Sequence, residues 1–413
     1  MLTSTDINLL IGVSSLLLSL LFLAIYARFS VSKGQLEEAM TSNRRQWFSN
    51  SRAKKWTELF FMKYSIVWIS WFGVVVISGV WETFGPNEYM IVGTSMAMPC
   101  FVLPWLRSSS IISNNENGLL SYLPTFLQYL INMLLPPMPA EELSRPFTQQ
   151  FWVKANAWIA IISIIGNYVW THYFYRLLRA TYTFSAHRIN FVPIAMFLCT
   201  HAYFCTYHTL TTIVLRRWWT SATYSLLGKN SKALVSAGLI LTLAIFTALT
   251  EAITIQNFPY YRIEDREWFY SVGSVVYSIY FLVSFPAYYL LDEDVNDDDD
   301  NNNSKEKSII KSIHKEDEVK RRRSSTSGEG RQRRQSTSQS LSVSSSSSII
   351  NRQEVYTLAR ACTESLAACM LVTLLLEAWR LVYTGARGLA HPGLLPFPPS
   401  DVSIDLQQGL PWI

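Results

Sequence analysis

Cysteine is scarce in this chain, and its few positions are scattered. There are five cysteines among 413 residues, and no two of them form a CxxC pair. Such pairs indicate zinc or redox sites, and even sets of cysteines indicate disulfide frameworks. Isolated cysteines in or near apolar segments usually act as small apolar side chains in helix packing. The pattern therefore predicts neither a zinc site nor a disulfide framework.

Histidine is also too sparse and too spread out for the common metal sites of membrane enzymes. Five of the six histidines lie outside residues 292–355, and they are not closely clustered. Membrane di-iron hydroxylases and desaturases need several histidine clusters at three- and four-residue spacing. HExxH, a Gly-rich phosphate loop and a dinucleotide fingerprint are absent as well. We therefore expect no metal and no cofactor.

Long apolar runs, by contrast, are abundant. The chain is 49% hydrophobic and 14% aromatic, and a membrane span needs about 20 mostly apolar residues. This pattern predicts an all-α polytopic membrane protein with about eight transmembrane helices, consisting of one N-terminal anchor and a seven-helix core. The eight segments are Ile7–Tyr26, Leu59–Val80, Tyr89–Leu106, Trp152–Tyr175, Phe191–Leu215, Leu234–Ile255, Val272–Leu291 and Leu366–Tyr383.

The distribution of charge divides the chain further. No Lys or Arg precedes the first apolar segment and several follow it, so residues 1–49 are predicted to be a signal anchor and a basic linker. The membrane core then occupies residues 50–291 and 356–413. Within the core, the proline-containing stretch 107–150 is a poor full span, and we expect an interfacial or re-entrant helix there.

Residues 292–355 are acidic, then basic, then Ser-rich, a composition that cannot bury apolar surface. We expect a disordered cytosolic loop. Ser324, Ser325 and Ser336 follow arginines in a pattern that basophilic kinases accept, which makes them candidate phosphorylation sites.

A single carboxylate interrupts the apolar run 241–261, "LTLAIFTALTEAITIQNFPYY". An ionisable group inside a membrane is costly and is a functional candidate by default. Glu251 has no basic residue within a turn on either side, so an ion pair within the helix does not explain it. Thr247 and Thr254 continue its polar stripe, and Tyr260 follows the predicted helix end at Pro259.

Other polar residues in the spans have structural explanations beside functional ones. His201 and His208 are seven residues apart, so both rings share one helix face with Phe204 between them. Buried histidines more often make a structural hydrogen bond than perform chemistry. Glu377 lies three residues before Arg380, where an ion pair on one helix face is about as plausible as catalysis. The preceding span carries a further polar and aromatic group, namely Asn167, Trp170, Thr171 and His172.

Several long segments resemble one enzyme family. They are "FWVKANAWIAIISIIGNYVWTHYFYRLLRATYTF" (151–184), "FVPIAMFLCTHAYFCTYHTLTTIVLRR" (191–217), "LTEAITIQNFPYYRIEDREWFYSVGSVVYSIYFLVSFP" (249–286) and the terminal "QQGLPWI". The chain resembles the cycloeucalenol cycloisomerases, the sterol cyclopropyl isomerases of phytosterol synthesis. Residues 54–61 and 366–381 fit the same pattern, whereas the N-terminal anchor and the stretches 107–150 and 292–355 are additions.

The resemblance implies a reaction, the opening of the 9β,19-cyclopropane of cycloeucalenol to give obtusifoliol. A proton must reach C19, positive charge develops at C9, and a proton leaves C8. Aromatic faces can stabilise the cation without adding to it. We expect Glu251 to be the acid, held by Thr247 or Thr254, with His201, His208 and Glu377 as the other catalytic candidates. His201 and His208 are expected to face the sterol, because their shared stripe would otherwise expose two polar rings to hydrocarbon. Since the cyclopropane methylene and the C8 hydrogen both lie on the β face, one carboxyl–imidazole unit could give the first proton and take back the second. The expected substrate-binding residues are Asn167, Trp170, Thr171, His172, Phe204, Thr247, Thr254 and Tyr260.

The resemblance also implies a setting and partners. We expect a multi-pass protein of the endoplasmic reticulum membrane that binds a 4α-methyl cyclopropyl sterol and membrane lipid, and no nucleic acid. Association with other enzymes of the sterol pathway is left open. Another sterol isomerase that shifts a double bond remains an alternative, as does a seven-helix transporter or receptor. Paired inverted repeats or a second track of intramembrane charges would favour a transporter, and neither is visible.

Overall fold

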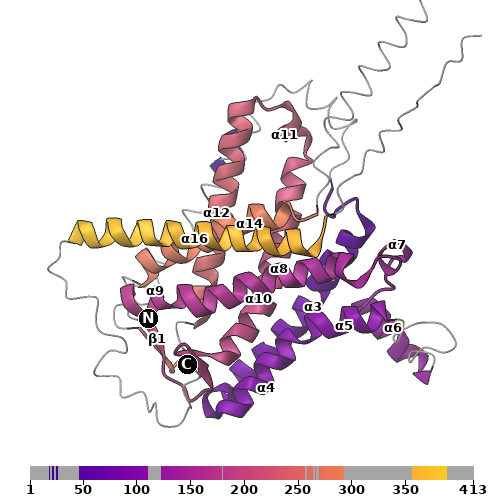
Figure 1. The fold of residues 1–413 in the computed structure, drawn as a ribbon, viewed down its shortest axis with the longest axis horizontal. Helices are drawn as coiled ribbons and strands as arrows, with labels where there is room; N and C mark the ends of the chain where they lie inside the picture. The colour runs from indigo at the N-terminus through magenta and orange to yellow at the C-terminus, as the bar shows by residue number, and fades with distance from the viewer. Residues whose placement is uncertain are drawn as a thin grey trace, which may run out of the picture. The chain divides into compact units, whose positions relative to one another are not determined.

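The described part of the chain is mostly helical (Figure 1). The computed structural model describes residues 46–109, 122–178, 180–255, 258–263, 269–292 and 356–387, together with residues 18, 21, 22, 25, 26 and 266. The α-helices are α3 (Arg52–Ile77), α4 (Pro86–Ala97), α5 (Pro99–Ser108), α6 (Thr125–Leu134), α7 (Ala140–Leu143), α8 (Phe151–Ile165), α9 (Thr171–Leu177), α10 (Ile194–Trp219), α11 (Ala222–Leu226), α12 (Lys229–Ile255), α14 (Ser274–Tyr289) and α16 (Leu358–Arg387). Short turns of other helix types are η1 (Val80–Thr83), η3 (Phe147–Gln149), η4 (Gly166–Trp170) and η5 (Phe269–Gly273).

Each of the seven apolar segments predicted for the core coincides with helical structure. Within the described residues, three helices are long and apolar enough to cross a membrane, in the ranges Arg52–Ile77, Lys229–Ala252 and Leu358–Leu381. The helices α4 and α5 are bent by 43° at a short break and would make a fourth if they form one span. The chain is therefore a helical membrane protein, and the predicted total of about eight spans is not confirmed.

Several predictions fall on other parts of the chain. The first apolar segment lies almost entirely outside the described residues. So does the predicted disordered loop, with Ser324, Ser325 and Ser336. In the predicted interfacial or re-entrant stretch the structure places α6, whose side chains are all at least partly exposed. Its position relative to a membrane stays a prediction.

The expectation of an all-α fold is wrong in one respect, because the described part of the chain also contains four short strands. Strand β1 (Ala180–Tyr182) pairs antiparallel with β4 (Tyr261–Ile263), so that Tyr182 lies opposite Tyr261. Strands β2 (Arg188–Ile189) and β3 (Val192–Pro193) form a hairpin. Asn190 and Phe191 at its tip have φ values of 50° and 64°, as two-residue hairpin turns require. Strands this short carry no periodic signal in the sequence.

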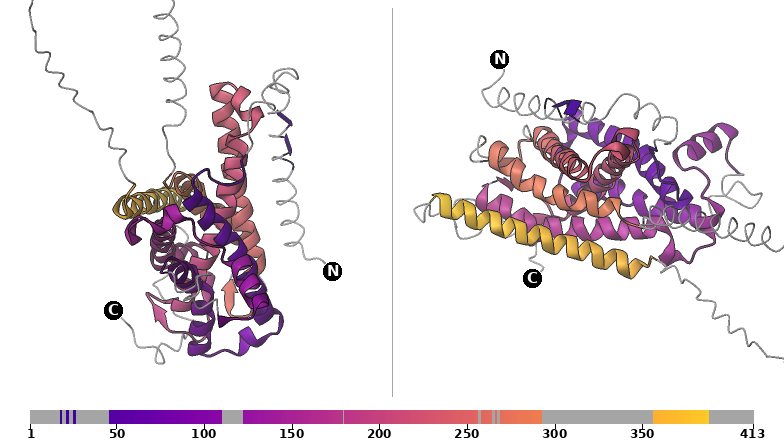
Figure 2. Two further views of the ribbon diagram at one scale, coloured as in Figure 1. Left: turned by 90° about the vertical axis from the view of Figure 1, so that its right-hand side faces the viewer. Right: turned by 90° about the horizontal axis from the view of Figure 1, so that it is seen from above.

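The helices pack around a core that α10 crosses. Helix α10 contacts α3, α4, α8 and α14, while α12 packs against α14. Helix α16 comes after residues 292–355 in the sequence and runs alongside α8, as Figures 1 and 2 show. Helix α16 thus packs against helices that precede it by about 200 residues, as the Trp170–Thr373 hydrogen bond shows.

Two buried cations fix the ends of these helices. Glu58 of α3 and Arg216 of α10 form a salt bridge of 2.7 Å in which both side chains are 3% exposed. Lys54 of α3 donates from Nζ to the carbonyl oxygens of Tyr289 and Leu291 at 2.8 and 2.7 Å. These carbonyls lie at the C-terminal end of α14, where helix carbonyl groups lack partners within the helix. Lys54 therefore caps α14 and joins it to α3.

Candidate functional site

A cavity lies in the middle of the helical core, beside the end of α12. It has about 690 Å³ of empty space, a figure that includes open solvent at its mouth. Its walls come from the α8–α9 region, β1, α10, α12, β4 and the η5–α14 region. The lining residues are Gly166, Asn167, Thr171, Phe174, Tyr182, Thr200, Phe204, Ala248, Glu251, Ala252, Ile255, Tyr261, Phe269, Gly273, Ser274, Tyr277 and Tyr280.

Glu251 is the carboxylate of this cavity, and its partner is a phenol. The hydroxyl of Tyr277, on the neighbouring helix α14, donates to Glu251 Oε2 at 2.6 Å. The surrounding lining is made of apolar, aromatic and hydroxyl side chains, and no Lys, Arg or His is among the lining residues. The prediction that Thr247 or Thr254 holds this carboxyl group is wrong. Thr247 donates to Leu243 O, and Thr254 donates to the main-chain oxygen of Glu251.

Two π-helical turns contribute to the walls of the cavity. The turn η4 (Gly166–Trp170) separates α8 from α9, and η5 (Phe269–Gly273) precedes α14. Such turns insert a residue into an otherwise regular helix and are frequent at functional sites. Gly273 permits a close contact, because a Cβ atom there would meet Leu178 Cδ1 at 2.9 Å. The two turns bring Asn167 and Ser274 to the cavity wall.

Aromatic rings form much of the remaining wall. Tyr182 and Tyr261, paired across β1 and β4, have ring centroids 4.8 Å apart. Tyr277 and Tyr280 of α14 are 5.0 Å apart in an edge-to-face arrangement. Burial raises the pKa of Tyr182 and of Tyr261 well above the usual range, so both phenols are neutral at physiological pH. The wall is therefore electron-rich without carrying negative charge.

The predicted position of the aromatic residue after α12 is off by one. Helix α12 ends at Ile255, before Pro259. The β1–β4 pairing then directs Tyr261 to the cavity, whereas Tyr260 does not line it. Since successive residues of a strand point to opposite faces, pairing in the other register would have exchanged the two.

His201 and His208 share a helix face as predicted, but neither lines the Glu251 cavity. His208 is fully buried, and its ring nitrogens contact Phe204 O and Ser284 Oγ, each at 2.9 Å. Its ring lies among Trp158, Phe285 and Tyr288. The expected joint carboxyl–imidazole unit is therefore wrong for this cavity, because the group that contacts Glu251 is Tyr277.

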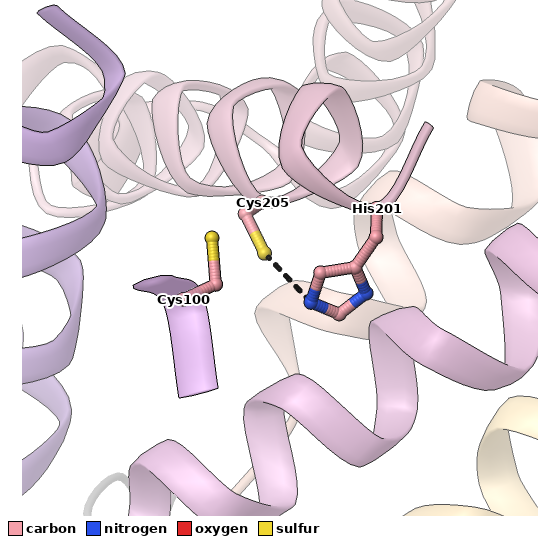
Figure 3. A group of neighbouring side chains, drawn as sticks. All are labelled: Cys100, His201 and Cys205. Carbon is pink, nitrogen blue, oxygen red and sulfur yellow. Dashed lines mark hydrogen bonds between the residues drawn. The ribbon is translucent and has the colours of Figure 1, made fainter. Parts of the chain in front are cut away.

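His201 belongs to a second buried group, with Cys100 and Cys205 (Figure 3). Their ligand atoms lie within 4.8 Å of one another, a donor set that suits soft metal ions. Asn156 argues against that use as the side chains are arranged. Its Nδ2 donates to Cys100 O and Trp152 O, so its Oδ1 faces His201 Nε2 at 3.1 Å.

His201 Nε2 must then carry the hydrogen of that bond. The same nitrogen is the ring atom next to Cys205 Sγ, at 3.6 Å. A protonated nitrogen has no lone pair for a metal, and changing the tautomer would break the bond to Asn156. We interpret the group as a hydrogen-bonded packing cluster, which is also stacked against Phe101.

Glu377 has the ion pair that its spacing indicated. Arg380 contacts Glu377 Oε2 at 2.7 Å, and the hydroxyl of Tyr173 donates to Oε1. The Glu377 side chain is 42% exposed. It does not line the Glu251 cavity.

Two further residues predicted to bind substrate also lie outside the lining. Trp170 is buried and donates from Nε1 to Thr373 Oγ1 at 3.0 Å. It supports the wall through its contact with Tyr280, at 4.6 Å between ring centroids. His172 lies edge-to-face with Tyr175, at 5.7 Å.

The structure thus brings together four of the predicted site residues, Glu251, Asn167, Thr171 and Phe204. The sequence analysis missed Tyr277 and the other tyrosines and Ser274. Tyr277 and Tyr280 stand at helical spacing in "SVVYSIY", inside one of the segments that carry the family resemblance. This spacing, in a segment that resembles the family, was the feature of the sequence that could have identified the two tyrosines.

One comparison with a known protein is informative. The chain is 31% identical over 367 residues to cycloeucalenol cycloisomerase from Arabidopsis thaliana, and the match covers 89% of this chain and 96% of that protein. No family model and no solved structure matches the chain.

Proposed function

Since this chain belongs to the cycloeucalenol cycloisomerase family, we propose that it opens the 9β,19-cyclopropane ring of cycloeucalenol to give obtusifoliol. The chain is an isomerase of sterol biosynthesis. Cycloeucalenol is the substrate in the name of the Arabidopsis relative, and we propose it for this chain as well. The observation that supports the chemistry in this chain is the apolar, aromatic cavity in which Glu251 is the one carboxylate among the lining residues.

The reaction needs one proton delivered and one removed, with no net change in composition. Transfer of a proton to C19 breaks the C9–C19 bond, and C19 becomes a methyl group. Positive charge develops at C9. Loss of the hydrogen on C8 then forms the 8,9 double bond and restores neutrality.

Glu251 is proposed as the acid, protonated at rest. A lone carboxylate in apolar surroundings is costly, and such groups usually remain neutral. Oε2 accepts the hydrogen bond from Tyr277, which leaves Oε1 to carry the proton toward the sterol. When that proton leaves, the Tyr277 hydroxyl stabilises the carboxylate that forms, because hydrogen bonds to charged groups are stronger than those to neutral ones.

The same pair can complete the reaction. The cyclopropane methylene and the hydrogen on C8 both lie on the β face of the sterol, so donor and acceptor need not stand on opposite sides. We propose that the Glu251 carboxylate, held by Tyr277, takes back the proton from C8. A carboxyl–phenol unit thus replaces the carboxyl–imidazole unit expected from the sequence.

The aromatic wall suits the intermediate between these steps. Cations are attracted to the faces of aromatic rings, and Tyr182, Tyr261 and Phe204 line the cavity beside Glu251. Neutral phenols and phenyl rings do not readily add to a tertiary carbocation. Water would add to it, so the buried setting also favours the alkene product.

The direct test is to express the chain in yeast microsomes, supply cycloeucalenol and analyse the products by mass spectrometry. Obtusifoliol is expected from the wild-type protein and not from microsomes without it. Supplying an 8,9-alkene sterol in parallel separates a double-bond isomerase from a cyclopropane-opening one. Conversion of that sterol with unchanged cycloeucalenol would overturn the proposal.

We also propose that the enzyme resides in the endoplasmic reticulum membrane. Three helices of the part that the structure describes are apolar enough to span a membrane, and a sterol substrate partitions into lipid. Fractionation of tagged protein with marker enzymes of that membrane tests the location.

A further inference from the structure

Two buried hydroxyl groups in the wall of the Glu251 cavity have no hydrogen-bond partner in the described part of the chain. They are Ser274 Oγ and the phenolic hydroxyl of Tyr280. Ser274 is 6% exposed and Tyr280 is 3% exposed. Both residues line the cavity. Buried polar groups in proteins nearly always have a partner, and a molecule bound in the cavity could supply one to both of these groups.

The same residue types nearby are satisfied by the protein itself. On the same helix, Ser278 Oγ donates to Val275 O at 2.7 Å, as helical serines commonly do. Tyr277 donates to Glu251, and Tyr89 donates to Trp81 O at 2.8 Å. Ser274 differs because it directly follows the π turn η5, which alters the helix ahead of it.

The substrate class fits these two groups. A sterol carries a hydroxyl on C3, and C3 and C10 are opposite corners of the same six-membered ring. C10 bears C19, the atom that must receive the proton. When Glu251 reaches C19, the C3 hydroxyl therefore lies only one ring away, inside the same cavity.

We propose that Ser274 and Tyr280 bind the 3β-hydroxyl of the sterol. A hydroxyl can donate one hydrogen bond and accept others, so it can satisfy both side chains at once. This contact fixes the first ring and thereby presents C19 to Glu251. The proposal rests on the proposed function, since it concerns how that substrate is oriented.

The test compares cycloeucalenol with its 3-deoxy analogue in microsomes that contain wild-type, Ser274→Ala or Tyr280→Phe protein. With the wild type, kcat/KM for the analogue is expected to be at least about tenfold lower, as the loss of a hydrogen bond in a buried site predicts. Each variant is expected to lose activity on cycloeucalenol, mainly through KM, and to retain the wild-type value for the analogue.

Ser278→Ala is the matched control, because Ser278 is a buried serine of the same helix that does not line the cavity. It should keep the full preference for cycloeucalenol over the analogue. If Ser274→Ala and Tyr280→Phe lower both substrates equally, or preserve the preference, the inference is overturned while the proposed function stands. If the wild type converts neither sterol, the proposed function itself fails. Protein amounts measured by immunoblot normalise all rates.

Discussion

Replacing Glu251 by Gln is the sharpest perturbation of the proposed mechanism. Gln has nearly the shape of Glu, and its amide oxygen can still accept the hydrogen bond that Tyr277 donates at 2.6 Å. It lacks only the transferable proton. The cavity and its packing should therefore persist, so that the chemical step is what changes.

The expected loss follows from the role of the residue. A positioned general acid typically contributes about 10² to 10⁴ in rate. Here the same group is proposed both to give the proton to C19 and to take the one from C8, so the upper part of that range applies. We expect kcat to fall by at least about 10³, which is roughly 4 kcal/mol of transition-state stabilisation.

The assay measures obtusifoliol formed from cycloeucalenol in microsomes under single-turnover conditions, with substrate binding followed separately. Glu377→Gln is the control, because it removes a carboxylate that is paired with Arg380 and does not line the cavity. That variant should leave measurable turnover. A Glu251→Gln enzyme that opens the ring at a rate comparable with wild type would refute the assignment and direct attention to Glu377 or the histidines.

Three further outcomes follow from the same contacts. Tyr277→Phe removes the hydrogen bond to the Glu251 carboxylate and should lower kcat about 10- to 100-fold in the microsomal assay, since such bonds contribute roughly 1.5–3 kcal/mol; an unchanged kcat contradicts its role. Glu58→Ala leaves Arg216 buried without its ion-pair partner and should destabilise the fold by about 3–5 kcal/mol. Thermal unfolding in detergent measures this loss. Replacing both Glu58 and Arg216 by apolar residues should restore much of it. Deleting residues 296–350 with a short Gly/Ser linker should preserve turnover, and inactive protein at normal abundance would contradict this.

The sequence predicted the carboxylate that lines the cavity but not its partner. Glu251 stood out because no basic residue lies within a turn of it in an apolar run, a property that is local and therefore readable. Tyr277 is 26 residues away on another helix. Its contact with Glu251 depends on how α12 packs against α14, and no periodicity records that packing.

The histidines show the opposite case, in which a correct local observation led to a wrong placement. A spacing of seven does put His201 and His208 on one face of α10. The two rings, however, contact Asn156 and Ser284, and of this face it is Phe204, between them, that lines the cavity. Helix α10 packs against α3, α4, α8 and α14, so protein and not lipid lies next to both buried rings. A polar stripe on a helix is expected to face the substrate only if its other neighbour would be lipid. The histidine rings of α10 contact other protein groups instead.

Glu251 and Glu377 differ in their surroundings for a reason that the chemistry can use. Each accepts a hydrogen bond from a tyrosine, Glu251 from Tyr277 and Glu377 from Tyr173. Arg380 adds an ion pair to Glu377, which makes that group a fixed anion. Glu251 has only neutral groups around it in the cavity. Opening a nonbasic cyclopropane requires a neutral acid that can become an anion and then return. The carboxylate without a cationic partner is the one whose charge is free to change during the reaction.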